Sequence, residues 1–247
     1  MMAEPPGPGS MDDRSGIDTV RRFFTGTGTT YDRIVNLTTL GFDRRWKGEI
    51  LKKIPPGSAT ILDQACGTGI LTLDIARRFP RARVIGVDVT EEYLRIAREK
   101  VRAQGLGNVE LIRGRAEEVL PETGIDCVTS SYLAKYADLD RLVGNIRRML
   151  RPDGVVIMHD FTYPPGRTFA RIWELYFTVL QTVGAWRWPA WRPAFEGLPG
   201  LLRETDWSDR LLRVLQEQGF CEAAVRSLFF GTSAIVSARR GVEQAEG

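Results

Sequence analysis

Short apolar runs alternate with longer amphipathic segments along the middle of the chain. The runs 59–63, 83–88, 109–112, 125–130 and 155–160 have the length and apolar character of buried β-strands. Between them, helical spacing of apolar residues marks 70–79, 90–104, 117–120 and 138–150, which prolines or glycines bring to an end. Such alternation predicts βαβ units, and therefore a mostly parallel sheet with helices on both faces.

The C-terminal part follows a different pattern. A helix is expected near 208–218, and the strand-like runs 221–230 and 232–239 are separated only by Gly231. A connection this short joins antiparallel strands. The sequence therefore predicts a Rossmann-like, mostly parallel seven-stranded sheet with an antiparallel last strand.

Two segments stand apart from this alternation. Residues 17–53 look helical, and residues 164–207, which hold five of the six tryptophans, interrupt the path to the last helix. We expect both to cover the mouth of the sheet, the second as a lid or substrate insertion. The chain then forms one domain over 16–240 with its core at 55–160, after a Pro/Gly-rich leader at 1–15 that we expect to be disordered.

Composition narrows the class of protein. No apolar run approaches the roughly 20 residues that span a bilayer. The formal net charge is +3, and the scattered arginines often lie near acids, so we expect no nucleic-acid partner. Three widely spaced cysteines and one histidine indicate neither a disulfide scaffold nor a metal site, and they suit the reducing cytoplasm.

The loop after the first strand carries the first candidate chemistry. It reads Asp63-Gln64-Ala65-Cys66-Gly67-Thr68-Gly69 and leads into a helix. Gly67 and Gly69 let the backbone approach a ligand or take a positive φ, and the helix presents free N–H groups there. Thr72 stands where a dinucleotide fold has its third glycine, which argues against NAD. A tight turn without a ligand remains the alternative.

Asp88 ends the second strand, where a carboxylate can accept both hydrogen bonds of a ribose diol. Its alternative role is a helix cap, which Thr90 can fill, so we favour ribose binding. Asp63 is expected to orient the loop or to approach the amino-acid part of the ligand. The backbone at Ala116, with the acid Glu117, can read an adenine edge.

Several motifs together resemble the class I S-adenosylmethionine-dependent methyltransferases: residues 62–69, Asp88, 115–117 and 150–154. More narrowly, 31–36, 44–47 and 160–164 resemble segments of the ubiquinone/menaquinone biosynthesis C-methyltransferases. The resemblance implies S-adenosylmethionine as cofactor. The candidate cofactor-binding residues are Tyr31, Asp63, Ala65, Gly67, Gly69, Asp88, Val89, Ala116, Glu117 and Ser130.

For the acceptor, the resemblance implies C-methylation of a prenylated quinol, whose hydroxyl needs a base. The candidate catalytic residues are His159, Asp160, Tyr132 and Lys135. His159 and Asp160 are neighbours on a strand and point to opposite faces, so we expect at most one to face the pocket. Ala134-Lys135 stands where the quinone enzymes show Arg-Asn. N- or O-methylation of another hydrophobic molecule, and cofactor binding without catalysis, therefore stay open.

Residues 168–191 combine many apolar side chains with few charges. A helix stripe of this kind is either core or a lid that lies at a membrane interface and admits a prenyl tail. The expected partners are a hydrophobic small-molecule acceptor, a membrane contacted through 168–191 at its inner face and, as a further option, a second copy in a homodimer.

Overall fold

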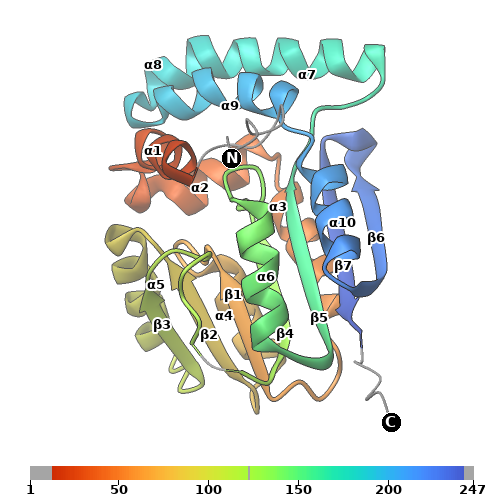
Figure 1. Cartoon of the computed structure of the whole chain (residues 1–247). Coiled ribbons are helices and arrows are strands. Elements are labelled where there is room, and N and C mark those ends of the chain that lie inside the picture. Colours follow the sequence, from red (N-terminus) through yellow and green to blue (C-terminus); the bar gives the residue numbers. More distant parts are fainter. Residues whose placement is uncertain (1–12, 122, 242–247) are drawn as a thin grey trace, which may run out of the picture.

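A single seven-stranded sheet organises the computed structural model, which describes residues 13–121 and 123–241 (Figure 1). The strand order is β3-β2-β1-β4-β5-β7-β6. Neighbouring strands from β3 to β5 pair in parallel, and β7 is antiparallel to both β5 and β6. The predicted Rossmann-like sheet is confirmed. The strands are β1 Thr60–Gln64, β2 Arg83–Asp88, β3 Val109–Arg113, β4 Ile125–Ser131, β5 Leu150–Phe161, β6 Phe220–Leu228 and β7 Ser233–Arg240.

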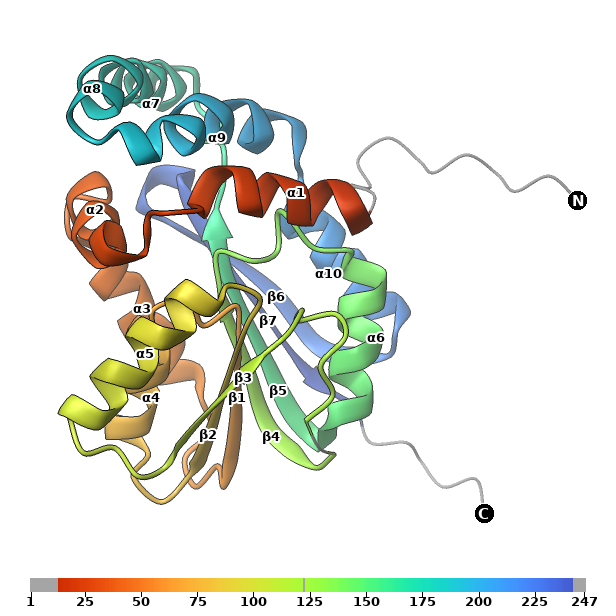
Figure 2. The same cartoon turned by 90° about the vertical axis from the view of Figure 1, so that its left-hand side faces the viewer.

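Helices cover both faces of this sheet, as predicted (Figure 2). Successive side chains of a strand point to opposite faces of the sheet. Those on one face pack with α3 and α4 in one apolar cluster, and those on the other face pack with α6 and α10 in a second cluster. The helices beside the sheet are α3 Phe42–Lys53, α4 Ile70–Arg78, α5 Glu91–Ala103, α6 Leu139–Met149 and α10 Trp207–Glu217.

Two local predictions are wrong. The helix expected at 117–120 is a single turn, in which the N–H groups of Glu118 and Val119 both donate to the carbonyl of Arg115. Pro121 lacks an N–H and follows too closely for a longer helix. The fifth strand begins at Leu150 rather than at Val155. Leu150 pairs with Ile125 and Val155 with Cys127 of β4, and the register shifts between these two pairs, as at a β-bulge.

A helical layer lies over the carboxyl ends of the parallel strands (Figures 1 and 2). The N-terminal segment and the insertion between β5 and α10 build it together, as expected. Of the predicted leader 1–15, residues 1–12 lie outside the described residues and the last three begin α1. No helix among the described residues has the length and hydropathy to cross a membrane. The layer contains α1 Asp13–Phe24, η1 Gly28–Thr30, α2 Tyr31–Thr38, α7 Arg167–Val179, the π-helix η2 Leu180–Gly184, α8 Ala185–Arg187, η3 Pro189–Trp191 and α9 Arg192–Glu204.

Candidate active site

Three residues of the loop between β1 and α4 have left-handed backbone conformations. Ala65, Gly67 and Gly69 have φ of +54°, +57° and +83°. The N–H of Cys66 donates to the carbonyl of Val87 at 2.9 Å, which fastens the loop to the end of β2. Because only glycine takes such conformations freely, the two glycines allow the chain to turn here and leave bare backbone at Gly67.

Asp88 holds this loop from the end of β2. Its carboxylate accepts the N–H of Gly67 and the N–H of Thr90, both at 2.8 Å. Thr90 occupies the N-cap position of α5, but its hydroxyl makes no capping bond, contrary to the expectation that Thr90 would take over the capping role. Burial raises the pKa of Asp88. The carboxylate thus joins the loop after β1 to the start of α5.

A small cavity of about 100 Å³ lies beside this loop, at the carboxyl ends of β1, β2 and β4. Ser131 and Tyr93 are among the residues that line it. Seven predicted cofactor-binding residues line this cavity: Tyr31, Ala65, Gly67, Asp88, Val89, Ala116 and Glu117. The strand ends therefore bring together residues that are far apart in sequence.

Three other predicted residues are not among the described residues that line the cavity. A Cβ at Gly69 would lie 2.6 Å from Leu73 and 3.2 Å from Ala97, so this glycine serves helix packing. Ser130 is buried, and its Oγ lacks a hydrogen-bond partner in the described structure. Asp63 lies behind the loop, and its contact with the cofactor stays a prediction.

Asp63 is bound to the sheet and to α4. It accepts hydrogen bonds from Thr72 Oγ1 at 2.6 Å and from Thr129 Oγ1 at 3.0 Å. Burial raises the pKa of Asp63 to about 6. The side chain is therefore placed to hold the loop in shape, which was one of its two expected roles.

Helix α1 covers the small cavity, a contribution that the sequence reasoning missed. Ile17, Val20 and Phe24 line it, and their spacing of three and four residues was the signal that could have shown this face. The cover is fastened through Glu92, which accepts the N–H groups of Gly26 and Gly28. Ligand sites usually measure about 300 Å³ or more, and with α1 in this position the cavity is smaller than that.

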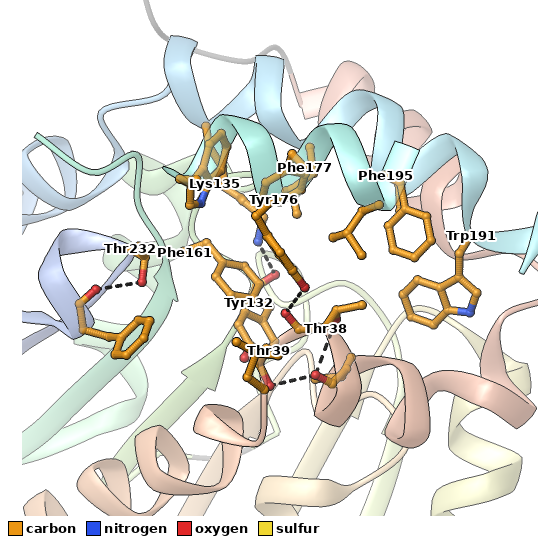
Figure 3. Close-up of a pocket in the computed structure, with 18 of the residues that line it drawn as sticks. Thr38, Thr39, Tyr132, Lys135, Phe161, Tyr176, Phe177, Trp191, Phe195 and Thr232 are labelled. Carbon is orange, nitrogen blue, oxygen red and sulfur yellow. Dashed lines mark hydrogen bonds between the residues drawn. The ribbon is translucent and has the colours of Figure 1, made fainter. Parts of the chain in front are cut away.

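A larger cavity of about 350 Å³ opens on the other side, under α7 and α9 (Figure 3). Its walls are almost entirely apolar and aromatic. The hydroxyl of Tyr176, from α7, donates to the carbonyl of Thr38 on α2 at 2.5 Å and ties the two sides of the cavity together. Lys135 is the one charged side chain among the described lining residues.

Lys135 forms a buried ion pair with Asp160. Its Nζ lies 2.5 Å from Asp160 Oδ1, and both side chains are almost fully buried. The ammonium also lies 4.4 Å from the ring centroid of Tyr136, within the range of a cation–π contact. Burial lowers the pKa of Lys135 and raises that of Asp160. Two predicted catalytic residues thus form one unit, with Lys135 at the cavity wall and Asp160 behind it.

His159 is in a different place. It lies against Trp46 and Tyr132, with ring centroids 5.3 Å away in each case, and it is not among the described lining residues. Burial holds the pKa of His159 well below its usual value, so the ring is neutral. Nδ1 lies 3.2 Å from Ser131 Oγ, and Nε2 has no hydrogen-bond partner in the described structure.

Tyr132, the remaining catalytic candidate, stands between the two cavities. Its hydroxyl donates to Asp43 Oδ1 at 2.7 Å, and Asp43 is also paired with Lys47. Phe24, Tyr31, Tyr132 and Tyr136 each line both cavities. These four rings form a shared aromatic wall, with the candidate cofactor loop on one side and the apolar cavity on the other.

The donor set fits the cofactor that the sequence predicts. Bare backbone at Gly67 and the carboxylate of Asp88 at the end of β2 suit a nucleoside, and aromatic faces suit a sulfonium cation. A mostly parallel sheet with one reversed strand, and a site of this composition at the strand ends, agree with the class I methyltransferase fold, and the family match given below shows the activity. The chain is an S-adenosylmethionine-dependent methyltransferase.

Comparison with known sequences gives the family. The model of the ubiE/COQ5 methyltransferase family matches residues 11–240, so the chain belongs to that family. It is 28% identical to the ubiquinone/menaquinone biosynthesis C-methyltransferase UbiE of Geobacter sulfurreducens, over 91% of this chain and 89% of that one. It is 26% identical to the demethylmenaquinone methyltransferase of Geobacillus kaustophilus, over 90% and 97% of the two chains. The resemblance predicted from the sequence motifs is confirmed.

Solved structures share the fold at low sequence identity. A SAM-dependent methyltransferase from Aquifex aeolicus superposes with a TM-score of 0.56 at 18% identity, covering 78% of this chain and 88% of that one. The geranyl diphosphate C-methyltransferase of Streptomyces coelicolor A3(2) gives a TM-score of 0.59 at 13% identity, covering 80% and 79%. At such identities the likeness describes the fold alone.

Proposed function

We propose that this methyltransferase transfers the methyl group to a ring carbon of a prenylated quinol, an acceptor like demethylmenaquinone. The observation that carries the proposal is the apolar cavity with one polar group. It offers about 350 Å³ of apolar space, enough for a ring and part of an isoprenoid tail, and Lys135 as the single charged lining group among the described residues. The names of the relatives, which include a demethylmenaquinone methyltransferase, support this choice.

The other acceptor classes fit the cavity less well. An amine or a lipid headgroup with an ammonium would place a cation beside Lys135, whose N–H donors suit an oxygen acceptor. A hydroxylated ring offers the lysine an oxygen that can carry negative charge. A protein that only binds the cofactor would not need an acceptor-sized cavity on the other side of the shared aromatic wall.

Activation of the ring falls to the pair of Lys135 and Asp160. A ring carbon becomes a good nucleophile when the neighbouring hydroxyl loses its proton. Burial lowers the pKa of Lys135 and raises that of Asp160, which favours movement of the proton of the ion pair from the lysine to the aspartate 2.5 Å away. The neutral amine that remains then accepts the proton of the ring hydroxyl and becomes an ammonium again. The oxyanion of the ring then faces the ammonium. After methylation, the ring carbon releases its hydrogen as a proton to water, and Lys135 returns its proton to the ring oxygen, which restores the aromatic quinol. The proton on Asp160 then moves back to Lys135 and re-forms the ion pair.

The aromatic wall aligns the two reactants. S-adenosylmethionine, when bound, supplies an electrophilic methyl group on a positively charged sulfur. The faces of Tyr31, Tyr132 and Tyr136 stabilise positive charge at this boundary and keep water away from it. Alignment of two reactants can contribute up to about 7–11 kcal/mol to the rate. The protein therefore has to position the two reactants and to accept the proton of the ring hydroxyl.

An acceptor comparison tests the proposal. Purified protein is given methyl-labelled cofactor with a reduced demethylated prenyl naphthoquinone, with the same ring lacking its tail, and with phosphatidylethanolamine. We expect label on the prenylated quinol, a much higher KM for the ring without a tail, and none on the amine lipid. Transfer to the amine lipid instead of the quinol would contradict the proposal, and cofactor binding without transfer to any acceptor would favour a non-catalytic protein.

A further inference from the structure

One side of the helical layer carries a row of exposed apolar side chains. The row follows α7 through η2 into α8, where each residue lies three or four positions after the previous one, on one helix face. α7 is the outermost helix of the layer (Figures 1 and 2). The members of the outer row and their exposed fractions are Ile172 57%, Leu175 66%, Val179 49%, Val183 58% and Trp186 76%.

The same helix also has a buried apolar face. Trp173 and Phe177 point inward and pack against Leu202 of α9. The sequence left open whether the apolar residues of 168–191 belong to the core or lie at a membrane interface. The inner half of this pattern is core, and the outer half is not covered by other residues of the described structure. A test of the outer surface must therefore spare Trp173 and Phe177, since polar residues there would damage the packing.

The outer row runs directly into the mouth of the acceptor cavity. Ile172 is a member of the row and also lines the cavity. Beside it, Phe169 stacks on Phe230 with ring centroids 4.3 Å apart, and Leu40 lies exposed on the α2 side. These three residues also line the cavity. The rim and the row form one continuous apolar surface.

The charged residues along α7, α8 and the segment that follows them are mostly positive. Residues 167–195 contain four arginines and a single acid, Glu174. All four arginines are exposed. The carboxylate of Glu174 is already bound by the hydroxyl of Tyr163 at 2.9 Å and by Arg203 at 3.1 Å. The four arginines are Arg167, Arg171, Arg187 and Arg192.

We propose that the outer row lies in the surface of an anionic lipid bilayer, with the arginines at the headgroups, so that a prenyl tail passes from the membrane directly into the cavity. The entry of a prenyl tail rests on the proposed function, whereas the docking to the membrane does not. Apolar side chains edged by arginine are the composition of an interfacial helix. A second copy fits less well, because a twofold contact would bring the arginines together and would close the cavity mouth.

Vesicle binding tests the docking. Wild type and Leu175→Ser/Val179→Ser are sedimented with vesicles of phosphatidylglycerol and phosphatidylcholine, and with phosphatidylcholine alone. Neither position lines the cavity, and Val225→Ser, on the exposed face of β6, is the matched control. We expect wild type and the control to bind anionic vesicles, and the double variant to bind them about tenfold or more weakly. Arg171→Glu/Arg187→Glu should remove the preference for anionic lipid.

Several results would overturn the proposal: no vesicle binding by wild type, equal binding by the double variant, or a stable dimer that Leu175→Ser/Val179→Ser dissociates. Activity separates this inference from the proposed function. The double variant should methylate a short-tailed acceptor in buffer at the wild-type rate and lose rate only on a long-tailed acceptor in vesicles. Absence of methylation together with intact vesicle binding would refute the proposed acceptor and leave the docking surface standing.

Discussion

Replacing Lys135 by methionine separates the chemistry of the buried ion pair from its contribution to stability. Methionine keeps much of the side-chain volume but leaves Asp160 without its cation. Loss of one partner of a buried pair costs about 3–5 kcal/mol, and we expect a value near 3 because the N–H of Phe161 still donates to Asp160 at 2.7 Å. Domains are typically stable by about 5–15 kcal/mol, so this variant should fold.

The double variant Lys135→Met/Asp160→Asn removes both charges. It should recover most of the lost stability, because no unpaired charge stays buried. Both variants should lose about 10²–10⁴-fold in kcat, the range of a missing general base. Cofactor affinity should stay at the wild-type value, since neither residue is among those described as lining the cofactor cavity.

Urea unfolding gives the stabilities, single-turnover transfer of labelled methyl gives the rate, and calorimetry gives the cofactor affinity. Lys52→Met, which breaks an exposed pair with Glu49, is the control and should change stability by less than about 1 kcal/mol. A double variant that folds and methylates within about threefold of wild type would show that the pair is structural, and the assigned proton transfer would be refuted.

Three further predictions concern the cofactor side. Asp63→Asn tests pH dependence: burial raises the folded pKa of Asp63 to about 6, above its unfolded value, so its contribution to stability is complete below about pH 4 and declines as the pH rises through 6. Wild type should therefore lose about 3 kcal/mol relative to Asp63→Asn between pH 4 and 7.5 in urea titrations, and parallel curves would disprove this. Asp88→Ala should weaken cofactor binding by about 1–3 kcal/mol in calorimetry, whereas Asp74→Ala, at a half-buried position of α4 that does not line the cofactor cavity, should not; equal affinities would remove the ribose role. Gly69→Ala should destabilise the fold by about 1–3 kcal/mol, because a Cβ there would meet a leucine at 2.6 Å. Gly67→Ala should cost about 1 kcal/mol of stability through its φ of +57° and should in addition weaken cofactor binding; an unchanged cofactor affinity of Gly67→Ala would contradict the assigned role.

Much of the fold was predictable because parallel strands are buried on both faces. Runs such as 83–88 and 125–130 are apolar for this reason, and the positions of their ends determine which loops meet. The single turn near 117–120 could not be told from a short helix by apolar spacing, since both have the same pattern over four residues. Spacing also could not show which half of α7 is exposed, because that depends on where α9 packs.

The cofactor side of the site could be predicted better than the acceptor side. Gly67 and Asp88 follow directly from strand order, which places the ends of β1 and β2 together. The pairing of Lys135 with Asp160 crosses from a loop to a strand, and no local pattern encodes it. Each residue was a candidate alone, while the pair, and the cover formed by α1, depend on tertiary packing.

The most direct test of the account is the position of the transferred carbon. Wild-type protein is incubated with ¹³C-methyl-labelled cofactor and a reduced demethylated prenyl naphthoquinone, and the product is analysed by carbon NMR. The account predicts a single labelled methyl group attached to a ring carbon. A label on oxygen, or an unlabelled quinol recovered from protein that binds the cofactor, would contradict it.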